Sequence, residues 1–433
     1  MTLRWILVLV LAQLGTLGPI QAQPKGQEHW VATWATAQTL VRPAAPASVT
    51  VQPSAAPAPG SAPAVPATTP REIAERGLNN QTVRMIVRTS IGGKRLRVRL
   101  SNAFGSAPVV LGSAHLALRA KDSGIVPDSD RSLSFNGKPG CTIAPGVVLL
   151  SDPVELNVPP VTDLAVSLYF PGETGPPTTH STGLHNTYIS KEGDQTAKPE
   201  IAEPVTTQSY YWLAGIDVAA AADAALLVAF GDSITDGARS TAETNHSWPA
   251  LLAARLAANK GTARIAVANL GIGGNRVLRD GTGASALARF DRDVLSQPGV
   301  KWVSLLEGIN DIGRMATVPA EAVTADELIA GYQQFIAQAH AHGIQVIGCT
   351  LTPYEGAGYS REDGERIRAA LNSWIRTSGA FDAVVDFEAA TRDAANPKRF
   401  RAGFDPGDHL HPNDAGYQAM ADAFDLKAFT ARR

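Results

Sequence analysis

The sequence predicts an α/β fold preceded by a β-rich domain, and three features of the 433 residues indicate it. Residues 81 to about 218 alternate apolar and polar side chains, as antiparallel strands do. From Leu226 onward, short continuous apolar runs alternate with helical patterns, which is typical of a parallel sheet with right-handed crossovers. Polar and glycine-rich stretches follow these runs, so they converge on one edge of the sheet. We therefore expect a β-rich domain over residues 23–218 and an α/β domain over residues 222–433.

The N-terminus has the pattern of a secretory signal peptide. Arg4 supplies a basic start, and residues 5–14 form an apolar run too short to cross a bilayer. The small residues that follow predict cleavage after Ala22. We expect a signal peptide over residues 1–22 and a secreted or periplasmic protein without a stable membrane anchor.

Composition limits the kinds of molecule that the protein is expected to bind. Hydrophobic residues make up 44% of the chain and charged residues 18%, which is enough apolar material for sizeable cores. The net charge of −2 gives no basic footprint for nucleic acid. Cys141 and Cys349 fall in different predicted domains, so we expect two unpaired thiols. No Cys/His cluster has zinc-ligand spacing, and neither metal nor cofactor is expected.

The first half reads as a sandwich of antiparallel strands of jelly-roll type. Residues 43–70 are rich in Pro and Ala, which predicts a flexible, partly extended loop that interrupts this domain. Alternating residues 82–90 and 94–102 flank Gly92-Gly93, which predicts a hairpin. Residues 164–170 predict another strand. Five arginines share the polar positions of the hairpin, and a solvated strand face is favoured over an anion site for Arg84, Arg88, Arg95, Arg97 and Arg99.

In the second half of the chain the spacing of the apolar residues changes, and short apolar runs alternate with helical patterns. The predicted strands are 226–230, 265–268, 302–306, 344–350 and 383–387, and the predicted helices are 249–259, 325–340 and 365–376. The first strand breaks into Gly231, Asp232 and Ser233, where Gly231 permits a sharp turn. Ser233 then lies at the carboxyl end of a buried strand, where α/β folds place their chemistry. It reads either as a helix N-cap or as a nucleophile that needs a base, an orienting acid and oxyanion donors.

Four short blocks follow the predicted strands: "GDSITDG" from Gly231, "NLGIGGN" from Asn269, "GIND" from Gly308 and "DHLHPNDAGY" from Asp408. In this order they resemble the SGNH, or GDSL-type, hydrolases over roughly the last half of the chain. The resemblance implies a flavodoxin-like three-layer domain with a parallel sheet. It also implies a serine esterase that works through an acyl-enzyme.

The resemblance assigns roles to residues. Ser233 matches the nucleophile, His411 the general base, and Asp408 the acid that fixes the imidazole tautomer. Taken alone, Asp408 also suits a turn. Ser233 N–H, the N–H of Gly274 and the side chain of Asn310 match the oxyanion donors, with Gly273 as an alternative to Gly274. Three further polar residues in the blocks are expected to brace loops: Asp232, Asn269 and Asp311.

Other histidines leave alternatives open. His409 follows Asp408 directly and is expected to face away from the site. His180 and His185, from the β-rich half, are candidates to reach over the site, and His246 either lines the cleft or caps a helix.

The first half also resembles a β domain found before the catalytic domain in some secreted bacterial members of the family, in "WVATWATAQ" and "TVRMIVRTSIGGKRLRVRLSNAFG". Such proteins are usually described as esterases, several linked to acylated plant polysaccharides. We therefore expect a secreted esterase for short acyl esters of carbohydrates, or for small alkyl and aryl esters. The alternatives are a lipase for longer chains and a glycan-binding protein with a vestigial hydrolase domain. Tyr210, Tyr211 and Trp212 are expected in the core of the junction between the two halves, with stacking on sugar rings at the mouth of the cleft as the alternative.

Overall fold

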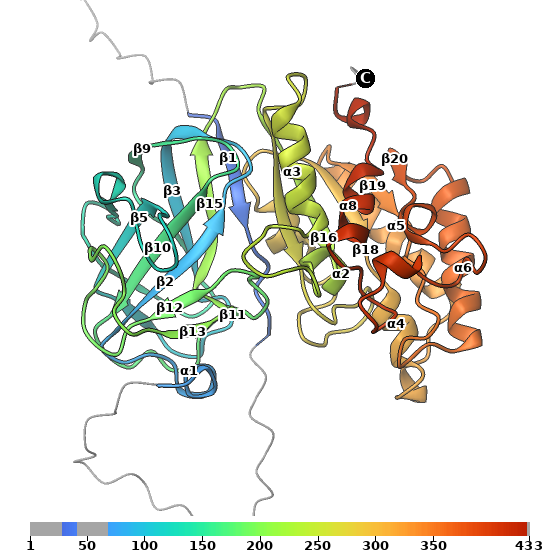
Figure 1. The fold of residues 1–433 in the computed structure, drawn as a ribbon, viewed down its shortest axis with the longest axis horizontal. Coiled ribbons are helices and arrows are strands. Elements are labelled where there is room, and N and C mark those ends of the chain that lie inside the picture. The colour runs from blue at the N-terminus through green and yellow to red at the C-terminus, as the bar shows by residue number, and fades with distance from the viewer. Residues whose placement is uncertain (1–27, 41–67, 431–433) are drawn as a thin grey trace, which may run out of the picture.

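The computed structural model describes residues 28–40 and 68–430 (Figure 1). The predicted signal peptide and most of the predicted Pro/Ala-rich loop lie outside the described residues. The loop prediction is wrong at its end, because Pro70 is the first residue of helix α1 (Pro70–Arg76). Thr69 and Glu72 form a capping box there, a local pattern that fixes a helix start whatever precedes it.

Two antiparallel sheets make up the first half and confirm the predicted sandwich (Figure 1). One sheet has the order β13-β12-β2-β10-β5-β6. Its strands are β2 (Gln81–Arg88), β5 (Ser113–Leu118), β6 (Arg131–Ser132), β10 (Asp163–Phe170), β12 (Thr187–Ile189) and β13 (Val205–Thr207). The other has the order β1-β15-β3-β8, with β9 also paired to β3. Its strands are β1 (Trp30–Ala35), β3 (Gly93–Ser101), β8 (Val148–Leu150), β9 (Val154–Val158) and β15 (Leu213–Ala219). Two small sheets pair β4 (Val109–Leu111) with β7 (Cys141–Ile143) and β11 (Thr179–His180) with β14 (Tyr210–Tyr211).

The predicted hairpin is wrong, although both of its strands form. β2 pairs with β10 and β12, whereas β3 pairs with β15 and β8 in the other sheet. The connection crosses between sheets because Ser90 is held by β1, through hydrogen bonds from its N–H and its hydroxyl to the carbonyl of Thr33. Alternation predicts that a segment is a strand and which side chains share a face, but it does not name the partner strand.

The prediction of a solvated arginine face is wrong for two of its five members. Arg84 is fully buried and donates to the backbone carbonyls of Ser123 and Lys198 at 2.7 and 2.8 Å. Burial lowers the pKa of Arg84 to about 10. Arg99 is buried as well and pairs with Asp217 at 3.0 Å. Alternation predicts that a charged side chain faces water. Arg84 and Arg99 instead lie inside the protein, where backbone carbonyls and a carboxylate satisfy them.

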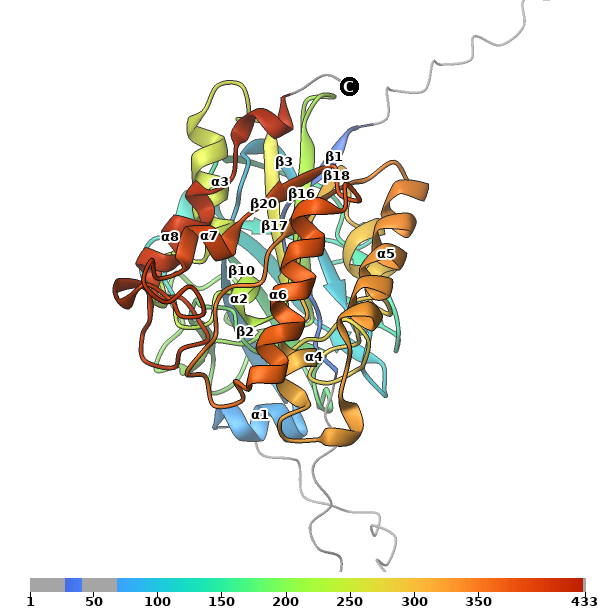
Figure 2. The ribbon, with the colours of Figure 1, turned by 90° about the vertical axis from the view of Figure 1, so that its right-hand side faces the viewer.

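The second half contains a five-stranded parallel sheet of order β17-β16-β18-β19-β20, which is the flavodoxin-like order (Figure 2). Its strands are β16 (Ala225–Gly231), β17 (Ile265–Gly271), β18 (Val300–Leu306), β19 (Gln345–Cys349) and β20 (Ala383–Val385). The helices are α2 (Ser233–Asp236), α3 (Trp248–Ala258), α4 (Ile309–Arg314), α5 (Ala325–Ala341), α6 (Glu362–Thr377), α7 (Phe387–Thr391) and α8 (Asp414–Asp422). α3 and α8 lie together on one side of the sheet, and α5 and α6 lie together on the other (Figure 2). The strand and helix predictions for this half are confirmed, except that β20 is shorter because Asp386 caps α7.

The two halves pack directly against each other through β1 and β17. Val267 of β17 donates its N–H to the Ser90 hydroxyl at 3.0 Å, and Arg99 donates to the Gln297 side chain at 2.7 Å. Tyr210, Tyr211 and Trp212 are buried in the large apolar core, where Trp212 packs on Phe170 of β10, and their place in the core of the junction stays a prediction.

Both cysteines are free thiols, Cys141 in β7 and the buried Cys349 in β19. No helix in the described part of the chain is long and apolar enough to cross a membrane.

Candidate active site

The carboxyl edge of the parallel sheet brings the four sequence blocks together. β16 ends at Gly231, where an added Cβ would lie 2.3 Å from the carbonyl oxygen of Leu306 in the neighbouring strand, so a side chain does not fit there. Asp232 then caps α2 by accepting a hydrogen bond from Ile234 N–H at 2.9 Å. Ser233 is therefore the first residue of a helix that starts at the edge of the sheet, and the residue is 9% exposed.

The hydroxyl of Ser233 lies 2.8 Å from Nε2 of His411, and Nδ1 of the same ring lies 2.9 Å from Oδ2 of Asp408. A carboxylate only accepts hydrogen bonds, so the ring proton is on Nδ1, and Nε2 is left to accept from the serine hydroxyl. The geometry is that of a nucleophile, a base and an orienting acid in one chain of hydrogen bonds. All three residues predicted for these roles are thus brought together.

Asp408 is held by four donors. Its Oδ1 accepts from the backbone N–H groups of Leu410 and His411 at 3.1 and 3.0 Å, and its Oδ2 also accepts from Nε of Arg239 at 2.9 Å. Partial burial opposes the negative charge, but these hydrogen bonds outweigh it and hold the pKa of the Asp408 carboxyl well below its usual value. Asp408 is therefore charged whenever the imidazole needs a counter-ion.

Asn310, at the start of α4, has a defined amide orientation. Its Oδ1 accepts from the Tyr359 hydroxyl at 3.4 Å, and its Nδ2 donates to the carbonyl of Asn275 at 3.0 Å. An amide nitrogen carries two protons, so one N–H is left for a ligand. Gly274 lies in the loop after β17 with φ +74°, a left-handed conformation that suits glycine. Neither its N–H nor that of Gly273 has an acceptor among the described residues, so Gly274 stays the predicted donor and Gly273 the alternative.

The three residues expected to brace loops do so. Asp232 caps α2, and Asn269 donates to the carbonyls of Thr235 and Asp236 at 2.9 and 3.2 Å. Asp311 accepts from the N–H groups of residues 277 and 278 at 2.8 and 3.2 Å.

Arg289 connects the loops of the site, and no sequence pattern predicted this role. It is fully buried, lies 3.6 Å from the centre of the Phe230 ring, and donates to the carbonyls of Gly231 and Leu270 and to Oδ1 of Asn275 at 2.7–2.9 Å. One guanidinium therefore ties the ends of two strands to the oxyanion loop. It lies outside the four blocks, so no local pattern marks it.

Buried carboxyl groups surround this arginine. Burial raises the pKa of Asp232 to about 7 and that of Asp311 to about 6. Burial and the nearby Asp232 raise the pKa of Glu307, which lies 3.6 Å from Nη2 of Arg289. The base of the site is thus a low-dielectric environment, where a hydrogen bond to a developing charge is strong.

The other histidines lie outside the reacting groups of the site. His409 turns away from the site and bonds Asp405, as predicted. His180 and His185 do not touch Ser233 or His411, so their predicted reach over the reacting groups is not observed. His180 instead binds Asp236 of α2 at 3.0 Å, and Nε2 of His185 binds Asn245 at 2.8 Å.

His246 bonds the carboxylate of Asp414 at the start of α8. Within the described residues, no group of three or more His, Cys, Asp or Glu side chains is placed to hold a metal ion.

Residues 229–419 match the family described as GDSL-like lipase/acylhydrolase. An acetylxylan esterase of Geobacillus stearothermophilus is 28% identical over 210 residues, which cover 46% of this chain and 91% of the relative. The solved structure of an acetylxylan esterase from the same organism is 25% identical, covers 48% of this chain and 95% of its own, and has a TM-score of 0.38. Another acetyl xylan esterase structure is 25% identical, covers 46% of this chain and 96% of its own, and has a TM-score of 0.37.

Proposed function

Because residues 229–419 belong to the GDSL-like lipase/acylhydrolase family, and the protein is thereby a carboxylic ester hydrolase, we propose that it is a secreted serine esterase that removes acetyl groups from carbohydrates. The observation that carries the mechanism is the unbroken hydrogen-bond chain from Ser233 through His411 to Asp408.

In the first half of the reaction, Ser233 Oγ attacks the ester carbonyl while Nε2 of His411 takes its proton. The carbonyl oxygen becomes an oxyanion, which accepts from Ser233 N–H, from Gly274 N–H and from the free N–H of Asn310. Asp408 stabilises the imidazolium without taking its proton. The intermediate then collapses, the C–O bond of the alcohol breaks, and His411 returns the proton to the leaving sugar oxygen.

In the second half, water attacks the acetyl group on Ser233. His411 takes the proton of that water, and the same donors stabilise the second oxyanion. The bond between Ser233 and the acetyl group breaks, Ser233 regains its proton from His411, and acetate leaves.

The choice of acyl group and alcohol rests on the relatives. A curated relative that matches over nearly its whole length is named as an acetylxylan esterase. The assembled Ser233–His411–Asp408 chain argues against the alternative of a glycan-binding protein with a vestigial site. Secretion rests on the signal pattern of residues 1–22, and N-terminal sequencing of the exported protein tests it, with Gln23 as the expected first residue.

One panel of substrates tests the proposal: p-nitrophenyl esters from acetyl to palmitoyl, and acetylated xylooligosaccharides. We expect acetyl esters to react fastest and Ser233→Ala to abolish turnover. Ser373→Ala, on an exposed position of α6, is the matched control and should react like the wild type. A preference for palmitoyl over acetyl esters would replace the proposed substrate with a long-chain lipid.

A further inference from the structure

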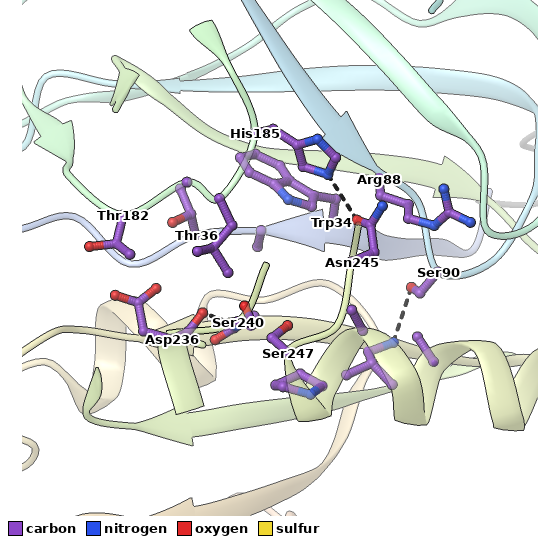
Figure 3. A pocket seen from close by; sticks show the side chains of 18 of the residues that line it. Trp34, Thr36, Arg88, Ser90, Thr182, His185, Asp236, Ser240, Asn245 and Ser247 are labelled. Carbon is purple, nitrogen blue, oxygen red and sulfur yellow. Dashed lines mark hydrogen bonds between the residues drawn. The ribbon is translucent and has the colours of Figure 1, made fainter. Parts of the chain in front are cut away.

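A cavity of about 100 Å³ lies between the two halves of the protein, beside the helix that begins with Ser233 (Figure 3). Trp34 and Thr36 line it from β1 and the residue after it, and Thr182 lines it from the loop after β11. Asp236 and Ser247 line it from α2 and from the N-cap of α3. Both halves therefore build its wall.

The wall presents polar groups that lack protein partners. Asp236 is 4% exposed; its Oδ1 binds His180, and its Oδ2 is covered by the protein. Within the described ranges, the hydroxyls of Thr36, Thr182 and Ser247 also have no protein partner. Figure 3 shows Thr36 and Thr182 facing Asp236 across the cavity. These hydroxyls are free to donate to, and accept from, the hydroxyl groups of a ligand.

The charged groups of the wall are already neutralised. Both nitrogens of His180 face acceptors, the carbonyl of Ala37 at 2.8 Å and Asp236 at 3.0 Å, so both donate, and the positive charge of the ring balances the negative charge of Asp236. Arg88 is bound to Asp163 at 2.8 Å. The cavity therefore favours a neutral ligand with hydroxyl groups over an ion.

Trp34 adds an apolar surface to this polar wall (Figure 3). Its ring is fixed edge-to-face against Tyr210, with 5.0 Å between the ring centres. An immobile indole beside several hydroxyl-binding groups matches the chemistry of a sugar ring, which has apolar C–H faces and hydroxyls at its edge.

We propose that this cavity binds one neutral sugar residue of the glycan, next to the residue whose ester reacts at Ser233. The proposal rests on the proposed function, since it concerns the alcohol side of the same substrate. Asp236, which lines the cavity, lies three residues after Ser233 and within one turn of α2, so a sugar in the cavity lies against the element that carries the nucleophile.

Calorimetric titration of the full-chain Ser233→Ala protein tests the proposal without turnover. The probes are unacetylated xylotetraose, mannotetraose and cellotetraose. We expect saturable binding of at least one of them, with a Kd in the millimolar range or below. Thr36→Val combined with Thr182→Val, which removes two hydroxyls at nearly constant volume, should weaken that binding at least tenfold. Thr317→Val, at an exposed hydroxyl of the α/β half, is the matched control and should leave the Kd unchanged.

Trp34→Ala is a second variant that removes the apolar wall, and its melting temperature shows whether it folds. Binding of none of the three sugars up to 20 mM, or equal Kd values for the Ser233→Ala protein with and without the Thr36→Val and Thr182→Val changes, overturns the proposal. Ester hydrolysis without sugar binding rejects the cavity proposal alone. Sugar binding without hydrolysis of any ester by the Ser233 protein rejects the proposed function alone.

Discussion

Replacing Asp408 with asparagine tests the orientation of the catalytic imidazole. Oδ1 of Asp408 accepts from two backbone N–H groups, and Oδ2 accepts from Nδ1 of His411. In Asp408→Asn the amide oxygen must stay on the backbone donors, because an NH₂ group there would meet donor against donor. The NH₂ group is then directed at Nδ1 of His411, which must give up its proton and accept. The ring carries its proton on Nε2 instead, where it cannot take the proton of Ser233.

The same change in a serine-protease triad lowers kcat about 10⁴-fold, which is about 5.5 kcal/mol at about 1.36 kcal/mol for each factor of ten. We expect a loss of that order for Asp408→Asn, measured with p-nitrophenyl acetate at pH 8. Arg239→Gln is the matched control, because it removes the other donor to Oδ2, an arginine side chain that is 61% exposed, and leaves the imidazole hydrogen bond in place. It should cost less than tenfold. A turnover number for Asp408→Asn within tenfold of the wild type would refute the assigned tautomer.

Three further predictions follow from the geometry. Asn310→Ala should lower kcat about 10²–10³-fold with little change in KM, because its free N–H is used only when the oxyanion forms; an effect confined to KM would make it a substrate-binding residue. His411→Ala should cost about 10⁴-fold or more in kcat and His409→Ala only a few-fold, and the reverse order would show that the wrong histidine has been assigned. For His180, burial opposes its charge, but the carboxylate of Asp236 outweighs this and raises the pKa of the ring. Its contribution to folding stability should be fully present below about pH 6.5 and lost as the pH rises through the raised value. Urea unfolding at pH 5.5 and 9 should therefore separate wild type from His180→Gln more at pH 5.5, and an equal separation would contradict the charged pair.

Local patterns were sufficient for the elements of the α/β half, and the resemblance to a family supplied the candidate catalytic residues. Continuous apolar runs mark buried parallel strands, and parallel strands bring the residues after them to one edge. Ser233 and Asn310 follow such strands and could be placed at one edge for that reason, whereas His411 and Asp408 were assigned by the resemblance of the last block to the family. The capping preferences of Asp232 and Asn413 likewise mark the starts of α2 and α8.

Contacts between residues far apart in the sequence could not be predicted in this way. Alternation marked β2 and β3 as strands, but their sheet membership depends on Thr33, about 60 residues earlier in the chain. The burial of Arg84 depends on carbonyls more than 30 residues away, and Arg289 reaches two strand ends from outside every block. The bond between His180 and Asp236 joins the two halves of the protein, and neither residue has a local signal for it.

The central claim is that Ser233 attacks the ester with His411 as its base. A p-nitrophenyl phosphonate that traps serine nucleophiles tests it directly, with intact-mass and peptide analysis of the labelled protein. We expect one phosphonyl group per chain, located on Ser233, with nitrophenol released and activity lost in equal proportion. His411→Ala should slow the labelling by orders of magnitude, because Oγ then has no base at 2.8 Å. Labelling of a different residue together with loss of activity, or full esterase activity in Ser233→Ala, would contradict the account.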